Sequence, residues 1–255
     1  MPFTFAHPAI VLPATYLPKK YYSLSALIIG SITPDFEYFI RMRDYSEYSH
    51  TWPGAIWFDL PLGLILLFLY HNLVRNMLIE HLPFGLNVRF SAFEKLNWNK
   101  YFRKNVSVVI ISLLAGIASH IFWDSFTHDW GYFANNVPEL KNGMGIFDYE
   151  ITGAGFFQDA SSIVGSIIML IYIFRMPEGN YTRRKKIFNF WILVGLMMIS
   201  VVNFRLYFGP LRGYQLIYDL VVTIISGFFI GIIVVSVLLK RKEHIPIYRN
   251  TMIPK

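Results

Sequence analysis

The sequence predicts an all-α membrane protein, a polytopic helical bundle of about six spans in one domain covering residues 1–255. Hydrophobic residues make up 55% of the chain and charged residues only 15%, a balance that is unusual for soluble domains. Several apolar stretches approach the roughly 20 residues that a helix needs to cross a bilayer. Basic residues also collect between alternate stretches, as they do in cytoplasmic loops.

The predicted spans follow the apolar stretches in order. Four are long, at residues 55–75, 106–124, 187–204 and 218–239. Two are shorter, at 23–40 and 160–175. The first contains Gly30 and Pro34 and the second starts after a Gly-rich loop, so we expect both to be partial, tilted or broken. We recognise no secretory signal peptide, because the opening residues lack a basic region and prolines interrupt their apolar stretch.

The distribution of charge predicts the orientation. If the segment before the first span is cytoplasmic, most of the 23 Lys and Arg lie inside and most of the 16 Asp and Glu lie outside. The basic inner loop is 76–105, which we expect on anionic lipid headgroups, and "RRKK" at 183–186 forms a second basic loop. The net charge of +7 therefore indicates a positive-inside protein of a plasma membrane, with lipids as partners and no nucleic acid.

The segment "GIASHIFWDSFTH" carries the strongest functional pattern. Because four residues of helix turn about 400°, His120, Asp124 and His128 share one face. His120 and Asp124 can chelate one ion from adjacent turns, whereas His128 lies about 12 Å of helix rise from His120. It would reach a second ion or act on a substrate. Imidazole and carboxylate together suit zinc or another divalent transition metal.

Further ligands must come from other segments, and Asp35 and His50 are the best placed, since both fall near the same membrane face as Asp124. Each residue also has a structural alternative. His120 could be a hydrogen-bonded structural group, Asp35 could cap a helix that starts after Pro34, and His50 could be an ordinary loop residue.

Other polar residues have simpler interpretations. Asp59 and Asp219 are expected at span boundaries or in packing, and His71, His81 and His244 are expected at the interface or in solvent on the basic side. The Gly-rich segment 129–159 is predicted as an outer loop, a candidate lid over the site. "QDASS" is then predicted to start a helix, with Asp159 as a cap or an additional ligand, and we prefer the cap.

Four motifs occur in this order, "FAHPAI", "GSITPDFEY", "SHTWPG" and "GIASHIFWDSFTHDWG", and the resemblance that they carry covers most of the chain. They resemble an uncharacterised bacterial membrane family, domain-of-unknown-function family 4184. More remotely, the pattern is similar to inner-membrane-associated proteins described as metal-dependent hydrolases. Those in turn are similar to the all-helical zinc-dependent phospholipase C and single-strand nuclease superfamily, although a likeness of fold does not transfer a substrate.

The resemblance implies a metal constellation of His7, Asp35, His50, His120 and Asp124, with zinc as the expected ion, in a bacterial inner membrane. The second acid of the remote pattern is Glu37 here, one methylene longer. For His7 to join residues near the outer face, we expect residues 5–17 to enter the membrane as a short re-entrant helix.

Two functions of different classes follow. The first is a membrane metal-dependent hydrolase acting on an ester or phosphoester of a lipid or envelope molecule, with His128 or Glu37 as the proton-transfer group. The second is a non-enzymatic transporter or assembly factor whose polar seam binds a cation or packs helices.

Overall fold

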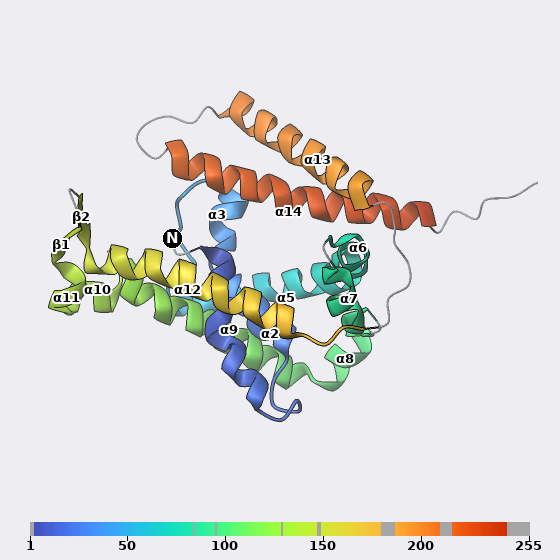
Figure 1. Ribbon diagram of the computed structural model, residues 1–255, viewed down its shortest axis with the longest axis horizontal. Coiled ribbons are helices and arrows are strands. Elements are labelled where there is room, and N and C mark those ends of the chain that lie inside the picture. Colours follow the sequence, from blue (N-terminus) through green and yellow to red (C-terminus); the bar gives the residue numbers. More distant parts are fainter. Residues whose placement is uncertain are drawn as a thin grey trace, which may run out of the picture.

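The prediction of an all-α bundle is confirmed by the computed structural model (Figure 1), in which long helices dominate and two short strands form the described β structure. The structure describes residues 3–83, 85–94, 96–128, 130–146, 149–179, 187–209 and 216–243. The basic "RRKK" loop and His244 lie outside these ranges.

The α-helices are numbered along the chain. They are α1 (Pro8–Val11), α2 (Leu24–Ile32), α3 (Phe36–Arg41), α4 (Trp52–Gly54), α5 (Leu60–Leu69), α6 (Arg75–His81), α7 (Leu86–Phe90), α8 (Trp98–Lys104), α9 (Val106–Thr127), α10 (Tyr132–Asn136), α11 (Pro138–Lys141), α12 (Gly153–Arg175), α13 (Ile187–Phe208) and α14 (Leu216–Glu243).

Shorter elements join them. Turns of 3-10 helix cover Thr4–Ala6, Leu12–Tyr16 and Ser91–Phe93, and π-helical turns cover Ala55–Asp59 and Tyr70–Val74. Strands β1 (Gly143–Ile146) and β2 (Tyr149–Thr152) pair antiparallel, with Gly143 opposite Thr152.

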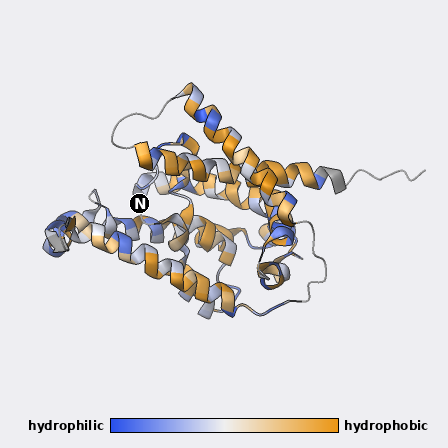
Figure 2. Cartoon of the chain, turned by 45° about the horizontal axis from the view of Figure 1, so that its top comes forward, coloured by the Kyte–Doolittle hydropathy of each residue, from blue (hydrophilic) through white to orange (hydrophobic). Residues whose placement is uncertain are grey.

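Within the described residues, five helical stretches are long and apolar enough to cross a membrane: Trp52–His81, Val106–Asn136, Gly153–Arg175, Ile187–Phe208 and Leu216–Lys240. They coincide with five of the six predicted spans. Figure 2 shows the hydrophobic colour along these helices, with hydrophilic residues gathered toward their ends. In such helices, close packing rather than the hydrophobic effect holds neighbours together.

The sixth predicted span, 23–40, is broken in the structure. Helix α2 has only nine residues and gives way at Thr33 to the short helix α3. Pro34 lies at this break and cannot donate a backbone hydrogen bond. The break leaves Asp35 at the N-cap position of α3, yet its side chain makes no capping hydrogen bond there.

The closest helix contact positions the site. In α2, a Cβ on Gly30 would overlap the Leu113 carbonyl, and in α9 a Cβ on Gly116 would overlap the Leu27 carbonyl. Glycine at both positions lets the two backbones touch, as small residues do in membrane helix pairs. The buried side chains of Leu113 and Ile117 continue this core along α9.

Two segments predicted as loops contain regular structure. The inner segment 76–105 carries α7 and α8 besides the end of α6, and the outer segment 129–159 carries α10, α11, the hairpin β1–β2 and the start of α12. The prediction that Asp159 caps a helix is wrong. Helix α12 already begins at Gly153, because the Thr152 hydroxyl caps it by accepting the N–H of Gly155.

The prediction that His71 and His81 are interfacial or solvated is also wrong. His71 is buried, stacks on Trp98 at 4.0 Å between ring centroids and contacts Ser25 and Arg75 through its two nitrogens. His81 is buried against Phe190 and donates from Nδ1 to the Met77 carbonyl. Both rings are therefore internal packing groups, with both nitrogens of His71 and Nδ1 of His81 partnered.

Candidate metal centre

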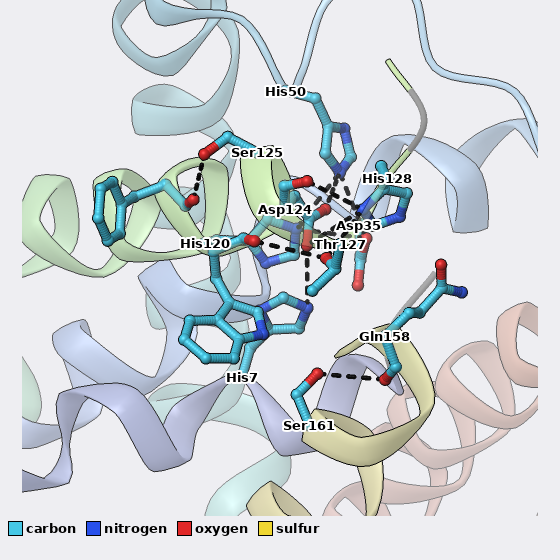
Figure 3. A network of polar contacts seen from close by, with 12 residues as sticks. His7, Asp35, His50, His120, Asp124, Ser125, Thr127, His128, Gln158 and Ser161 are labelled. Carbon is cyan, nitrogen blue, oxygen red and sulfur yellow. Dashed lines mark hydrogen bonds and ion pairs between the residues drawn. The ribbon is translucent and has the colours of Figure 1, made fainter. Parts of the chain in front are cut away.

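Four side chains from three segments that are distant in sequence lie close together (Figure 3). Asp35 comes from the break between α2 and α3, His50 from the loop before α4, and His120 and Asp124 from successive turns of α9. One ligand atom from each of them lies within 4.8 Å of all the others. The side chains are at most 6% exposed.

The distances among these atoms are those of a tetrahedral site. The Nε2 atoms of His50 and His120 are 3.3 Å apart, and His50 Nε2 lies 3.5 Å from both Asp35 Oδ1 and Asp124 Oδ2. His120 Nε2 lies 3.5 and 3.3 Å from the same two oxygens. Ligands bound at about 2.0–2.1 Å around tetrahedral zinc are separated by about 3.3 Å.

The other nitrogen of each histidine is held by a second set of groups. His120 Nδ1 donates to the Ser31 carbonyl at 2.7 Å, which leaves the lone pair of its Nε2 facing the cluster. The Gly30–Gly116 contact brings this carbonyl to α9. His50 Nδ1 contacts the hydroxyls of Ser49 at 2.8 Å and Ser46 at 3.2 Å. Metal-binding histidines are oriented in this way.

Glu37 holds the loop that carries His50. Its carboxylate accepts the backbone N–H groups of Glu47, Tyr48 and Ser49 at 2.8–3.0 Å and pairs with Arg41 at 2.7 Å. Burial would raise the pKa of Glu37, but these backbone hydrogen bonds, led by that of Ser49, outweigh it and lower the pKa to about 2. Both oxygens face the loop, so the structure places Glu37 away from the ligand cluster.

The loop ends in a strained residue. His50 has a φ of 57°, in the left-handed region that non-glycine residues rarely occupy. Such conformations persist where the surroundings impose them, and they concentrate at functional sites. The hydrogen bonds that Glu37 accepts supply that constraint here, and they aim the His50 ring at Asp35 and Asp124.

The N-terminal segment brings His7 to the same cluster. The chain passes through α1, turns, and returns as α2, and the Ser23 N–H donates to Ser112 Oγ of α9. The His7 ring stacks on His120 at 3.9 Å between centroids, and its Nε2 lies 3.6 Å from Asp124 Oδ1. Burial, with the nearby His120, lowers the pKa of His7 to about 3, so its ring is neutral.

His128 occupies the far side of Asp124. It follows the last residue of α9 and is buried, with Nδ1 3.7 Å from Asp124 Oδ1 and 3.3 Å from the Asp124 carbonyl. The structure therefore brings all five proposed ligands and His128 together, and it leaves out Glu37.

Several polar atoms of the cluster have no hydrogen-bond partner in the described parts of the chain. They are both ring nitrogens of His7, Asp35 Oδ2, Asp124 Oδ1 and His128 Nε2. Buried polar atoms without partners are costly, and buried carboxylates need a positive partner. The donor set therefore fits a divalent cation.

Asp59 and Asp219 have separate positions. Asp219 of α14 accepts the Asp44 N–H at 2.8 Å and lies 3.9 Å from Arg43, so it anchors the segment after α3. Asp59 is fully buried at the end of a π-helical turn, and neither of its oxygens has a hydrogen-bond partner among the described residues. Sequence reasoning gave no role to Ser31, whose carbonyl orients His120, although Gly116 one turn before His120 was a signal of close packing.

Comparison with known proteins identifies the family. No curated protein and no solved structure matches the chain. A family model matches residues 1–237, which span the whole metal centre and all five candidate membrane helices except the last residues of α14. The chain thus belongs to the family described as "Domain of unknown function (DUF4184)".

Proposed function

We propose that this protein is a membrane-embedded metal-dependent hydrolase that acts on an ester or phosphoester of a lipid or envelope molecule. One observation carries the proposal. Among Asp35, His50, His120 and Asp124, the His–His and His–Asp ligand atoms are 3.3–3.5 Å apart, and the Nδ1 atom of each histidine is held by a hydrogen-bonding group. Zn²⁺ is the ion that this mixture of imidazole and carboxylate suits best.

The position of the centre supports a substrate of the membrane. Asp124 lies near the C-terminal end of the candidate span α9, and His50 directly precedes the span that starts at Trp52. Ionisable groups at such depth are expensive, and they concentrate where ions or substrates bind. A lipid or membrane-anchored envelope molecule can reach this depth, whereas a large soluble substrate cannot.

The chain's own groups have distinct parts. When bound, the ion would act as a Lewis acid on the scissile group and make water a nucleophile at neutral pH. Asp35 and Asp124 balance its charge and fix its position. His128, which contacts Asp124 and keeps Nε2 unpartnered among the described residues, is the proton-transfer group. Glu37 is a positioning residue, because it acts on His50 through the loop.

Elemental analysis of detergent-purified protein tests the proposal. Wild type should hold near-stoichiometric zinc or manganese, and a His120→Ala, Asp124→Ala double variant should lose it. His81→Ala is the matched control, because His81 is buried but lies against Phe190 rather than in the cluster. The metal-loaded wild type should then hydrolyse phospholipid or other lipid phosphoester substrates, and the double variant should not.

The alternative function predicts a different pair of results. A transporter or assembly factor with a cation-binding seam would retain the ion and show no hydrolysis across lipid ester and phosphoester substrates. Absence of metal in the wild type, even after reconstitution with zinc and manganese, would contradict both the hydrolase and the cation-binding seam.

A further inference from the structure

We propose that Asp124 bridges two metal ions, and that His7 and His128 hold the second of them. This inference builds on the proposed metal centre and adds a binding position beyond the cluster of Asp35, His50, His120 and Asp124. It places His7 at the second ion and gives His128 a ligand role in place of the proton transfer proposed above.

The two oxygens of Asp124 face different partners. Oδ2 lies 3.5 Å from His50 Nε2 and 3.3 Å from His120 Nε2, so it belongs to the first position. Oδ1 lies 3.6 Å from His7 Nε2 and 3.7 Å from His128 Nδ1. Each oxygen therefore meets its own pair of imidazoles, as in a carboxylate shared by two ions.

The distances from Asp124 Oδ1 to His7 Nε2 and His128 Nδ1 are too long for hydrogen bonds. Donor–acceptor distances for N–H···O hydrogen bonds are about 2.7–3.2 Å, shorter than either contact to Oδ1. Asp124 Oδ1 and both ring nitrogens of His7 lack hydrogen-bond partners within the described chain, although the side chains of Asp124 and His7 are each only 1% exposed. An ion bound to Asp124 Oδ1 and His7 Nε2 would satisfy both atoms, and the 3.6 Å between them is close to the ligand spacings of the first site.

His128 offers a ring nitrogen to this position while its backbone is fixed. Its Nδ1 lies 3.2 Å from Thr127 Oγ1 and 3.3 Å from the Asp124 carbonyl, and Nε2 is the unpartnered atom among the described residues. The set of His7, His128 and Asp124 supplies three protein ligands. Three ligands with one open position are typical of catalytic rather than structural metal sites.

The charges predict unequal affinities. The first position has two carboxylates and two neutral imidazoles, which balance a divalent ion. The second has two imidazoles and shares the carboxylate of Asp124, so less negative charge compensates it. We therefore expect a chelator to remove the second ion first.

Metal content after reconstitution with zinc tests the bridge. Wild type should hold about two ions per chain, while His128→Ala and His7→Ala should each hold about one. Asp35→Asn should weaken binding of the first ion. Asp124→Asn should lose both ions, because Asp124 alone is a ligand at both positions. His81→Ala, a buried histidine outside the cluster, should keep about two. Using both His7 and His128 variants protects the test against one of them failing to fold.

Reconstitution with Mn²⁺ adds a second readout. Wild type should give the exchange-coupled paramagnetic resonance spectrum of a pair of ions, and His128→Ala should give that of an isolated ion. A single ion per wild-type chain with unchanged stoichiometry in His128→Ala would overturn the bridge and leave the one-ion centre intact. Loss of activity in His128→Ala with full metal content would also overturn it and return His128 to proton transfer.

A separate observation points to the substrate, and this second inference rests on the proposed hydrolase function. We propose that the groove between α1, α9 and α12 holds the acyl chain of a lipid substrate. The groove has a volume of about 350 Å³, and its walls include Ile10, Trp123, Val164 and Ile168. His7 lines the same groove, so the apolar channel reaches the candidate metal centre.

The groove is open to the membrane along α12. Val164 is 55% exposed and Ile168 is 42% exposed on a helix long and apolar enough to span a bilayer. Apart from His7, its only polar side chain is Ser161, whose hydroxyl donates to the Gln158 carbonyl. An apolar wall with one polar end matches an ester-linked acyl chain, whose scissile group would face His7.

Photo-crosslinking with a phosphatidylglycerol that carries a diazirine in its acyl chain tests the groove, with the protein in phosphatidylethanolamine–phosphatidylglycerol nanodiscs. Crosslinks should be several-fold denser at Val164 and Ile168 than at Ile163 and Ile167, which are exposed on α12 outside the groove. Ala160→Trp should remove the excess by filling the groove, and Ile163→Trp should not.

Equal labelling of both faces of α12, or labelling that Ala160→Trp leaves unchanged, would show that the groove holds only bulk lipid and would overturn the inference. This outcome is distinct from failure of the hydrolase proposal, which metal content and ester hydrolysis decide together. If crosslinking is enriched but no ester is cleaved, the groove binds lipid and the catalytic proposal fails.

Discussion

Glu37 accepts the backbone N–H of Ser49 at 2.8 Å, and Ser49 directly precedes the metal-ligand candidate His50. The carboxylate thus sets the direction of a ligand that it does not touch. Glu37→Gln should lower zinc affinity by about 10–100-fold, as loss of groups that orient ligands commonly does. Zinc competition with a chromophoric chelator measures this. Glu47→Gln is the control, since Glu47 pairs with the same Arg41 but is exposed, and it should bind zinc like wild type.

The same carboxylate predicts a pH dependence of stability. Its pKa is lowered from the ordinary 4.5 to about 2, so its stabilising contribution is complete above about pH 4.5 and is lost as the pH falls toward 2. In metal-free protein, the difference in thermal midpoint between wild type and Glu37→Gln should be constant from pH 7 to 5 and should shrink below pH 4.5. A difference that grows on acidification would contradict the assignment.

The contact between α2 and α9 predicts that replacing Gly116 by alanine is destabilising, whereas replacing Gly195 is not. Gly116→Ala places a methyl group against the backbone of Leu27 and Ser31, so the helices must separate at a cost of about 1–3 kcal/mol, and His120 loses its carbonyl partner. Both the thermal midpoint and zinc affinity should fall. Gly195→Ala in α13, where the added methyl meets nothing within 4 Å, should leave both unchanged or slightly raise the midpoint.

Sequence reasoning located the long spans and the pattern on α9 because both are local. Hydropathy over about 20 residues and the four-residue spacing of His120 and Asp124 need no knowledge of tertiary structure. Apart from the family resemblance, Asp35 and His50 could be proposed as ligands only because both fall near one membrane face. Their convergence depends on the break after α2 and on the loop that Glu37 holds. The role of Glu37 could not be read from its position, because its partners lie 10–12 residues away.

The burial of His71 and His81, on the basic side, could not be predicted from the sequence. Their positions in the sequence suggested interface or solvent, but whether a ring is buried depends on neighbours from distant segments, such as Trp98 for His71 and Phe190 for His81. Within the segment 129–159, predicted as the connection between two spans, sequence reasoning did not find α10 and α11, since helices of four or five residues have too few turns to show a helical period.

Comparing substitutions of His71 and His120 therefore tests which histidine is structural and which binds metal. His71→Phe keeps the ring that stacks on Trp98 but removes the contacts to Ser25 and Arg75, so it should destabilise the fold by about 1–3 kcal/mol. Its metal content should equal that of wild type. His120→Phe, an equal change in shape within the cluster, should lose the metal. Retention of metal by His120→Phe would exclude the proposed ligand set.

The final prediction concerns the side of the membrane on which the centre lies. Lys104 precedes α9 and Glu47 lies in the loop that carries His50, near the other end of α9, and both side chains are exposed. The positive-inside rule places Lys104 in the cytoplasm and Glu47 outside. The chain contains no cysteine, so Lys104→Cys and Glu47→Cys each introduce a single label site, with wild type as the blank. In intact bacterial cells, a membrane-impermeant maleimide should label Glu47→Cys at once and Lys104→Cys only after permeabilisation. The reverse pattern would put the metal centre at the cytoplasmic face and make its substrate a lipid of the inner leaflet, while labelling of both from one side would mean that α9 does not cross the membrane.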